Sequence, residues 1–264
     1  CFYFHPDGYT TSGRQVMGRH VAGESFLKAA LKYGERSNLW IQVEDENHIR
    51  DFKSIARSYQ RIEEINVVRR SSLENLRTPG CLYLPGPGIG EWAQHRSRFG
   101  NASWSLCGIT HTTASTRAMD AVAGLLTAPV QPWDALICSS TAGRSVVETV
   151  LRSREEALAA RSGGDVSRLQ ASRPQLPVIP LPLPNHAMLV PECNKRRARS
   201  SLGLPDTASV VLWLGRLSVC TKLDPWPTYS ILERVAQRLN HPLILVECGP
   251  DDEPSQGSAL KALR

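Results

Sequence analysis

The chain has 264 residues, of which 41% are hydrophobic and 21% are charged, and its formal net charge is +6. This amount of apolar material is enough for one large domain or two modest ones, and it excludes a disordered chain. No apolar run approaches the roughly 20 residues that a membrane-spanning helix needs, so an integral membrane protein is excluded too. The seven Cys residues form no C-x-x-C pair and support neither a disulfide framework nor a zinc site, so we expect a cytoplasmic protein.

Basic residues outnumber acidic residues by 31 to 25, which favours a ligand or partner that carries phosphate. They are spread along the chain, apart from the run Lys-Arg-Arg-Ala-Arg at 195–199. Nucleic-acid-binding modules usually place such charge beside stacking aromatic residues, which this run lacks. We therefore interpret the run as the exposed face of a helix, and we expect no nucleic acid partner and at most a peripheral contact with membranes.

Short apolar runs alternate with helical patterns along the chain. The chain begins inside a predicted strand, and further strands are predicted at 38–43, 65–68, 81–84, 105–109, 134–138, 178–181, 209–214 and 243–247. Helices are predicted at 15–33, 47–60, 139–161 and 227–239. Continuous apolar strands are typical of parallel sheets that are buried on both faces. The alternation predicts an α/β protein with doubly wound layers, in which ligands bind at the carboxyl ends of the strands.

The Pro-rich segment 171–191 interrupts this pattern, because neither a helix nor a central strand continues through closely spaced Pro residues. We predict a domain junction there, with a first domain at 1–188 and a second at 189–264. The second domain shows only two strands, and two strands cannot close a domain. We therefore expect this domain to be incomplete in the chain.

Three Gly-containing loops follow predicted strands, where backbone amides can approach a phosphate. In the first, Gly13 and Gly18 match the G-x-x-x-x-G spacing of a P-loop, but Arg19 and His20 replace the required Lys and Ser or Thr. A nucleoside triphosphatase is therefore excluded, and a phosphate-binding loop and a plain turn remain. The second loop, at 86–90, lacks the last Gly of the dinucleotide fingerprint and is interpreted as a structural turn.

The third loop begins at Gly215, directly after the predicted strand at 209–214. Arg216 and Lys222 follow and offer a planar fork and a point charge, which together suit a diphosphate. Two solvent-exposed cations are the alternative interpretation of this loop. His111 follows another predicted strand, where it is either a core His or a ligand at the strand's carboxyl end.

The acidic cluster Glu44-Asp45-Glu46 is the remaining group with possible chemistry of its own. Adjacent residues at a strand end rarely present the two facing carboxylates that a glycoside hydrolase needs. We interpret the cluster as a solvated loop.

The order of these motifs resembles that of the family-four retaining glycosyltransferases of GT-B fold. The most specific pieces are Arg-Ala-Arg-Ser-Ser-Leu-Gly-Leu-Pro at 197–205 and Leu-Val-Glu-Cys-Gly-Pro at 245–250. The other matching pieces are the Gly13 loop, the run Gly-Ile-Thr-His-Thr at 108–112, the runs at 132–140 and 178–182, and Gly215-Arg216-Leu217 with Lys222.

The resemblance implies two Rossmann-like doubly wound domains with parallel sheets, an acceptor-side domain and a truncated donor domain. It implies retaining transfer of a sugar from a nucleotide-diphosphate sugar to a hydroxyl of a glycan, a lipid-linked acceptor or a small molecule. Arg216 and Lys222 would bind the donor diphosphate together with the Gly13 loop, and His111 would face the donor sugar as the catalytic-site residue. No cofactor and no metal are implied, and the sequence contains no Asp-x-Asp motif.

Two observations keep other functions open. Leu223 follows Lys222 where many family members have Gly, and the family's E-x7-E segment is not present before Arg264. The alternatives are a non-catalytic module that binds a sugar nucleotide or a partner, and a GT-B sugar-nucleotide epimerase.

Overall fold

The computed structural model describes residues 1–11, 17–34, 38–113, 115–181, 192–215, 217 and 224–249. The chain divides into two compact units, Cys1–Leu183 and Pro184–Arg264. The domain boundary predicted at 188/189 lies outside the described residues, and both it and the incompleteness of the second domain stay predictions.

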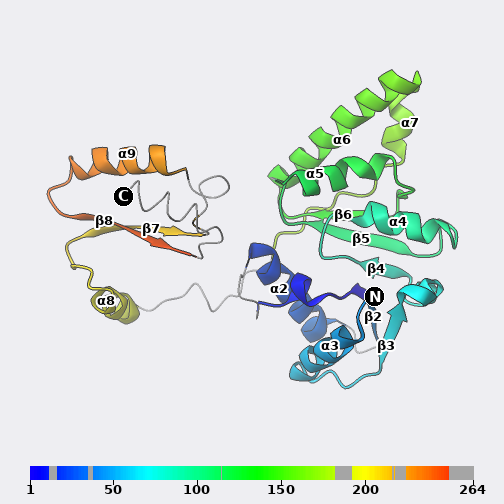
Figure 1. The fold of residues 1–264 in the computed structure, drawn as a ribbon, viewed down its shortest axis with the longest axis horizontal. Helices are drawn as coiled ribbons and strands as arrows, with labels where there is room; N and C mark the ends of the chain where they lie inside the picture. The colour runs from blue at the N-terminus through cyan, green and yellow to red at the C-terminus, as the bar shows by residue number, and fades with distance from the viewer. Residues whose placement is uncertain are drawn as a thin grey trace. The chain divides into compact units, whose positions relative to one another are not determined.

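The first unit contains a six-stranded sheet (Figure 1). Its strands are β1 (Phe2–Tyr3), β2 (Leu39–Val43), β3 (Ile65–Arg69), β4 (Cys81–Tyr83), β5 (Ser105–Thr110) and β6 (Ala135–Cys138). They lie in the order β3-β2-β1-β4-β5-β6, and every neighbouring pair is parallel. The order reverses between β1 and β4, which is the topological switch point of a doubly wound sheet. The predicted α/β class with a parallel, doubly wound sheet is confirmed.

Helices cover both faces of this sheet. They are α1 (Pro6–Tyr9), α2 (Gly18–Tyr33), α3 (Glu46–Ser58), η1 (Arg70–Arg77), α4 (Ile89–Ser97), α5 (Thr116–Ala123), η2 (Gly124–Leu126), α6 (Thr141–Ser162) and α7 (Val166–Ala171). One core lies against α2 and α3, and the other lies against η1, α4, α5 and α6. In β6, Leu136 and Cys138 belong to the second core, whereas Ile137 between them belongs to the first. β6 is therefore apolar without interruption because both of its faces are buried.

The prediction of a strand at 178–181 is wrong. Residues 175–179 run along the free edge of β6, but they form only isolated bridges, one of them between Cys138 and Val178. The Cys138 amide donates to the Pro177 carbonyl at 2.8 Å, and the Ile179 amide donates to the Cys138 carbonyl at 3.0 Å. Pro177 and Pro180 have no N–H group to donate, so the segment covers the sheet edge without forming a regular strand.

Three Cys residues lie in strands of this sheet, with Cys81, Cys107 and Cys138 in β4, β5 and β6. Burial raises the pKa of the Cys107 thiol to about 11 and also raises the pKa of Cys81 and Cys138. These three side chains therefore stay protonated at neutral pH and pack as small apolar groups.

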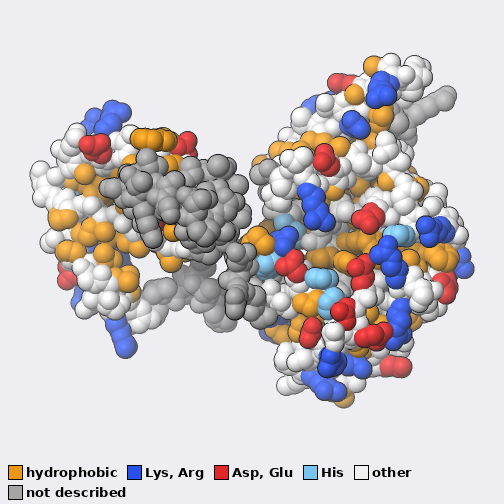
Figure 2. Space-filling model, viewed as in Figure 1, with side chains coloured by type: hydrophobic (Ala, Val, Ile, Leu, Met, Phe, Trp, Pro, Cys, Tyr) orange, Lys and Arg blue, Asp and Glu red, His pale blue; other side chains and the backbone are white. Residues whose placement is uncertain are grey.

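The second unit is described over α8 (Glu192–Ser201), β7 (Ser209–Leu214), α9 (Pro225–Ala236) and β8 (Leu243–Cys248). β7 and β8 are parallel and pair from Ser209 with Leu243 to Leu214 with Cys248. The basic run lies on α8, and Lys195, Arg196 and Arg197 are exposed as predicted. Elsewhere Lys and Arg side chains are dispersed over the visible face of each unit (Figure 2).

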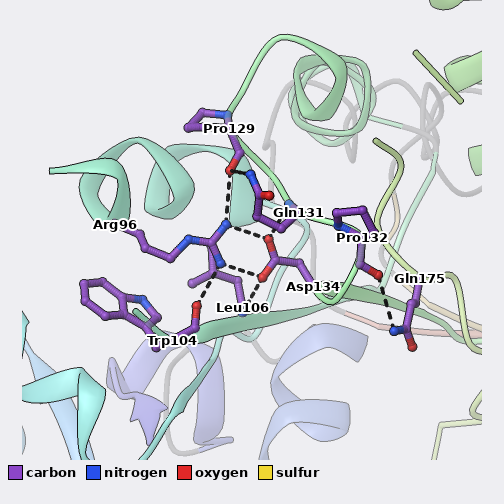
Figure 3. Close-up of polar contacts among 8 residues, drawn as sticks. All are labelled: Arg96, Trp104, Leu106, Pro129, Gln131, Pro132, Asp134 and Gln175. Carbon is purple, nitrogen blue, oxygen red and sulfur yellow. Dashed lines mark hydrogen bonds and ion pairs between the residues drawn. The ribbon is translucent and has the colours of Figure 1, made fainter. Parts of the chain in front are cut away.

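A buried ion pair joins α4 to the amino ends of β5 and β6 (Figure 3). Arg96 and Asp134 are both 0% exposed, and two N–H···O bonds of 2.6 and 2.8 Å connect them. The guanidinium also donates to the Trp104 and Pro129 carbonyls. The backbone amides of Leu106 and Gln131 donate to the Asp134 carboxylate at 2.8 and 2.7 Å. The pair therefore connects α4, β5, the start of β6 and the loop before β6.

We expect Asp134→Ala to lower the free energy of unfolding by about 3–5 kcal/mol, because the Arg96 charge would stay buried without its partner. Urea denaturation of the full chain measures the change. Glu148→Ala is the control, since its pair with Arg144 is about half exposed, and it should cost less than about 0.5 kcal/mol. Equal losses in the two variants would contradict a structural role of the buried pair.

Candidate functional site

The carboxyl ends of β1, β4, β5 and β6 meet at one edge of the first sheet, beside the switch point. Glycine makes close packing possible at this edge. A Cβ atom on Gly23 would lie 1.8 Å from the Gly8 carbonyl oxygen, so only Gly allows α2 to contact the backbone of α1. A Cβ atom on Gly108 would lie 2.7 Å from the Gly86 oxygen, which explains the contact of β5 with the loop after β4. The structural turn predicted at 86–90 is found at 86–88, and Ile89 and Gly90 already belong to α4, whose N-cap is Gly88.

A pocket of about 280 Å³ lies at the carboxyl ends of β5 and β6. It is lined by Thr110, His111, Thr112, Thr113, Ser139, Ser140, Ala142, Gly143 and Val146. The Ser140 hydroxyl caps α6 by accepting the Gly143 amide at 3.0 Å. Among these lining residues none is acidic, and hydroxyl groups and the first turn of a 22-residue helix face the pocket together. Such a lining suits a polar ligand group that accepts hydrogen bonds.

His111 directly follows β5 and lines this pocket, as its position in the sequence predicted. Its Nε2 atom lies 2.7 Å from the Pro85 carbonyl oxygen, which can only accept, so Nε2 carries the hydrogen. Its Nδ1 atom is buried and has no hydrogen-bond partner in the described part of the chain.

Burial lowers the pKa of His111, the hydrogen bond to Pro85 opposes this shift, and the charge of Arg19 adds to it. The ring is therefore neutral at pH 7 and is held by the loop after β4. This arrangement positions His111 as an uncharged group of the site, and its contact with a donor sugar stays a prediction.

Gly13, Arg216 and Lys222 lie outside the described residues, so their predicted roles stay predictions. The structure describes the strand that leads to Arg216. The Gly215 amide donates to the Cys248 carbonyl at 3.0 Å, so the strand pairing extends to the residue before Arg216.

Sequence reasoning missed a cluster at the start of α2. The Asp7 carboxylate lies 2.8 Å from Nη2 of Arg19 and 3.2 Å from Nε2 of His20. His20 is 5% exposed, and its Nδ1 accepts the Met17 amide at 3.2 Å. The available signal was Arg19 in the first turn of a helix that has no acidic residue there.

The three residues of the acidic cluster after β2 are exposed, as predicted, and their carboxylates do not face one another as a catalytic pair would. Asp45 caps α3 by accepting the Asn47 amide at 2.8 Å. Glu44 pairs with Arg70, and Glu46 pairs with Arg69. No pair of facing carboxylates results among these three residues.

Over the described ranges, no group of three or more His, Cys, Asp or Glu side chains could hold a metal ion. None of the helices in the described part of the chain is long and apolar enough to cross a membrane.

Comparison with known proteins finds a likeness of fold. The chain is similar to the crystal structure of Anabaena Alr3699/HepE in complex with UDP, with a TM-score of 0.51 and 15% sequence identity. The likeness covers 94% of this chain and 62% of the HepE chain, so this chain spans less than two thirds of HepE. No protein-family model and no curated protein sequence matches. The shared feature is therefore the α/β fold with its parallel sheets.

We expect His111 to titrate below the ordinary value of about 6.5, because burial disfavours the charged ring. The folded chain then binds this proton less readily than the unfolded chain. The contribution of His111 to stability is therefore present above about pH 6.5 and is lost as the pH falls. A ¹H–¹⁵N spectrum of the His rings, assigned with His111→Asn, measures the midpoint and the Nε2–H form. A midpoint above about 6.5, or a hydrogen on Nδ1, would contradict the geometry.

Proposed function

We propose that the chain acts as a glycosyltransferase that moves a sugar from a nucleotide-diphosphate sugar to an acceptor hydroxyl with retention of anomeric configuration. The observation that carries the proposal is the fold shared with HepE, which binds UDP, over 94% of this chain. The motif order from the Gly13 loop to Gly215-Arg216-Leu217 supports the same function. The polar pocket at the carboxyl ends of β5 and β6 lies where doubly wound sheets bind their ligands.

In this proposal, Arg216 and Lys222 stabilise the diphosphate as it gains charge. The bond between the anomeric carbon and the diphosphate oxygen breaks, and the acceptor oxygen bonds to the same face of that carbon. The acceptor proton passes to the departing phosphate oxygen, so no side-chain nucleophile is needed. His111 is neutral, and its part is to position the donor sugar rather than to carry a charge.

The acceptor is a glycan, a lipid-linked molecule or a small molecule, and the cytoplasmic location is part of the same proposal. Calorimetry of the full chain with a series of nucleotide sugars tests donor binding, and product analysis tests transfer. Binding without any transfer would favour the non-catalytic module, and conversion of the donor sugar into its epimer would favour the epimerase. Absence of binding by every nucleotide sugar would overturn the proposal.

We expect Arg216→Ala and Lys222→Ala each to lower kcat by about a hundredfold, because each removes a cation directed at developing charge. The measurement is the steady-state rate of sugar transfer, with thermal unfolding as a check on folding. Arg234→Ala is a matched control, since Arg234 is an exposed residue of α9 with no assigned role. Unchanged turnover in the double variant of Arg216 and Lys222 would contradict the diphosphate clamp.

We expect transfer to need no divalent metal, because the two cations supply the charge that a metal ion otherwise supplies to a leaving diphosphate. The measurement is the transfer rate in excess chelator, compared with the rate after magnesium or manganese is added. A rate that collapses in chelator and returns with either metal would contradict this mechanism.

A further inference from the structure

Arg19 occupies an unfavourable position in the helix that begins at the carboxyl edge of the first sheet. It is the second residue of α2, and the first turn of α2 contains no acidic residue. The amino end of a helix carries partial positive charge, so a cation there is repelled and an anion is attracted. A sequence that breaks a local rule at the ligand-binding edge of a sheet points to a functional position.

The Arg19 side chain pairs with one acidic residue, Asp7. Its Nη2 atom donates to Oδ2 of Asp7 at 2.8 Å, and its Nε atom lies 3.2 Å from Nε2 of His20. Asp7 belongs to α1, directly after β1, and its other oxygen lies 3.2 Å from buried His20. His20 is itself fixed by the Met17 amide. Asp7 therefore orients the guanidinium, while its Nη1 group has no partner within the described ranges.

The held guanidinium is open to a ligand. The Arg19 side chain is 48% exposed. It also lies close enough to the pocket residue His111 for its charge to act on that ring. A guanidinium presents parallel N–H donors that match the oxygens of a phosphate group.

We propose that Arg19 is a substrate-contacting residue whose guanidinium binds the phosphate groups of the nucleotide-diphosphate donor at the carboxyl edge of the first sheet. This inference rests on the proposed function and concerns the first unit alone. Asp7 is then a positioning residue that acts through Arg19.

An ordinary surface ion pair is the alternative, and the chain contains one for comparison. Arg69 is 53% exposed and pairs with Glu46, so it matches Arg19 in exposure and in having an acidic partner on another element. Both Nε and Nη2 of Arg69 donate to the Glu46 carboxylate, at 2.6 and 3.2 Å. Glu46 lies in the first turn of α3, where an acidic residue is favoured. Arg69 thus makes a two-bond pair with an acidic residue in a favourable setting, whereas only Nη2 of Arg19 donates to a carboxylate within the described residues.

The experiment is calorimetry of the full chain with UDP, inorganic pyrophosphate and uridine, at two salt concentrations. We expect Arg19→Ala to weaken binding of UDP by about 10- to 100-fold, because a charge-assisted hydrogen bond to phosphate is lost. Binding of pyrophosphate should weaken as well, binding of uridine should not change, and higher salt should reduce the difference. Arg69→Ala should bind all three probes as the unchanged chain does. Arg19→Lys keeps the charge without the fork and should give an intermediate affinity.

The outcomes separate this inference from the proposed function. If the unchanged chain binds UDP and Arg19→Ala binds it equally well, the role of Arg19 is overturned and the proposed function stands. An equal loss for uridine and UDP would also overturn a phosphate contact. If the unchanged chain binds neither UDP nor any other nucleoside diphosphate, the proposed function fails and this inference fails with it. Circular dichroism checks folding, and Arg19→Gln replaces Arg19→Ala if the latter does not fold.

Discussion

The buried pair of Arg96 and Asp134 is the constraint on which the first unit depends. Two charges without any exposure are tolerated only where every oxygen and most donors are paired, and here the backbone of β5 and of the loop before β6 completes the pairing. The pair draws α4, β5 and β6 together at the amino ends of the strands. The Asp134 carbonyl also accepts the Gln175 amide at 2.8 Å, so the segment that covers the edge of β6 is attached at the same point.

The network of Arg96 and Asp134 lies at the amino edge of the sheet, and the pocket lined by His111 lies at the opposite, carboxyl edge. At the carboxyl edge the loops after β1, β4, β5 and β6 are short and pack on glycine, as Gly8 and Gly108 show. The polar groups there are hydroxyls, a neutral His and one partly paired Arg rather than a closed network. Doubly wound sheets in general bind their ligands at the carboxyl edge.

The sequence predicted most strands of the first sheet, because strands buried on both faces have apolar runs such as 106–109 and 135–138. It failed where Pro residues interrupt an apolar run, since 178–181 looks like a strand but lacks the necessary N–H groups. The sequence analysis also missed α4, because the Gly-Pro-Gly turn at 86–88 directly precedes the helix and obscures where it starts. Arg96 and Asp134 are 38 residues apart, and no local pattern relates them. Of the candidate site, the place of His111 was predictable from its position after a strand, whereas its contact with Pro85 and the cluster of Asp7, Arg19 and His20 depend on the fold.

The charges at the carboxyl edge follow from the different chemistry of His111 and Arg19. Burial and the nearby guanidinium both oppose protonation of His111, so the ring contributes no charge at neutral pH. Asp7 orients the Arg19 guanidinium without burying it. In the proposed function, a neutral His111 keeps the charge of the site constant, because a cationic His would change that charge within the physiological range. His111 would then contribute shape and hydrogen bonding, and the contact with the diphosphate would be made by Arg19, whose planar guanidinium matches phosphate oxygens.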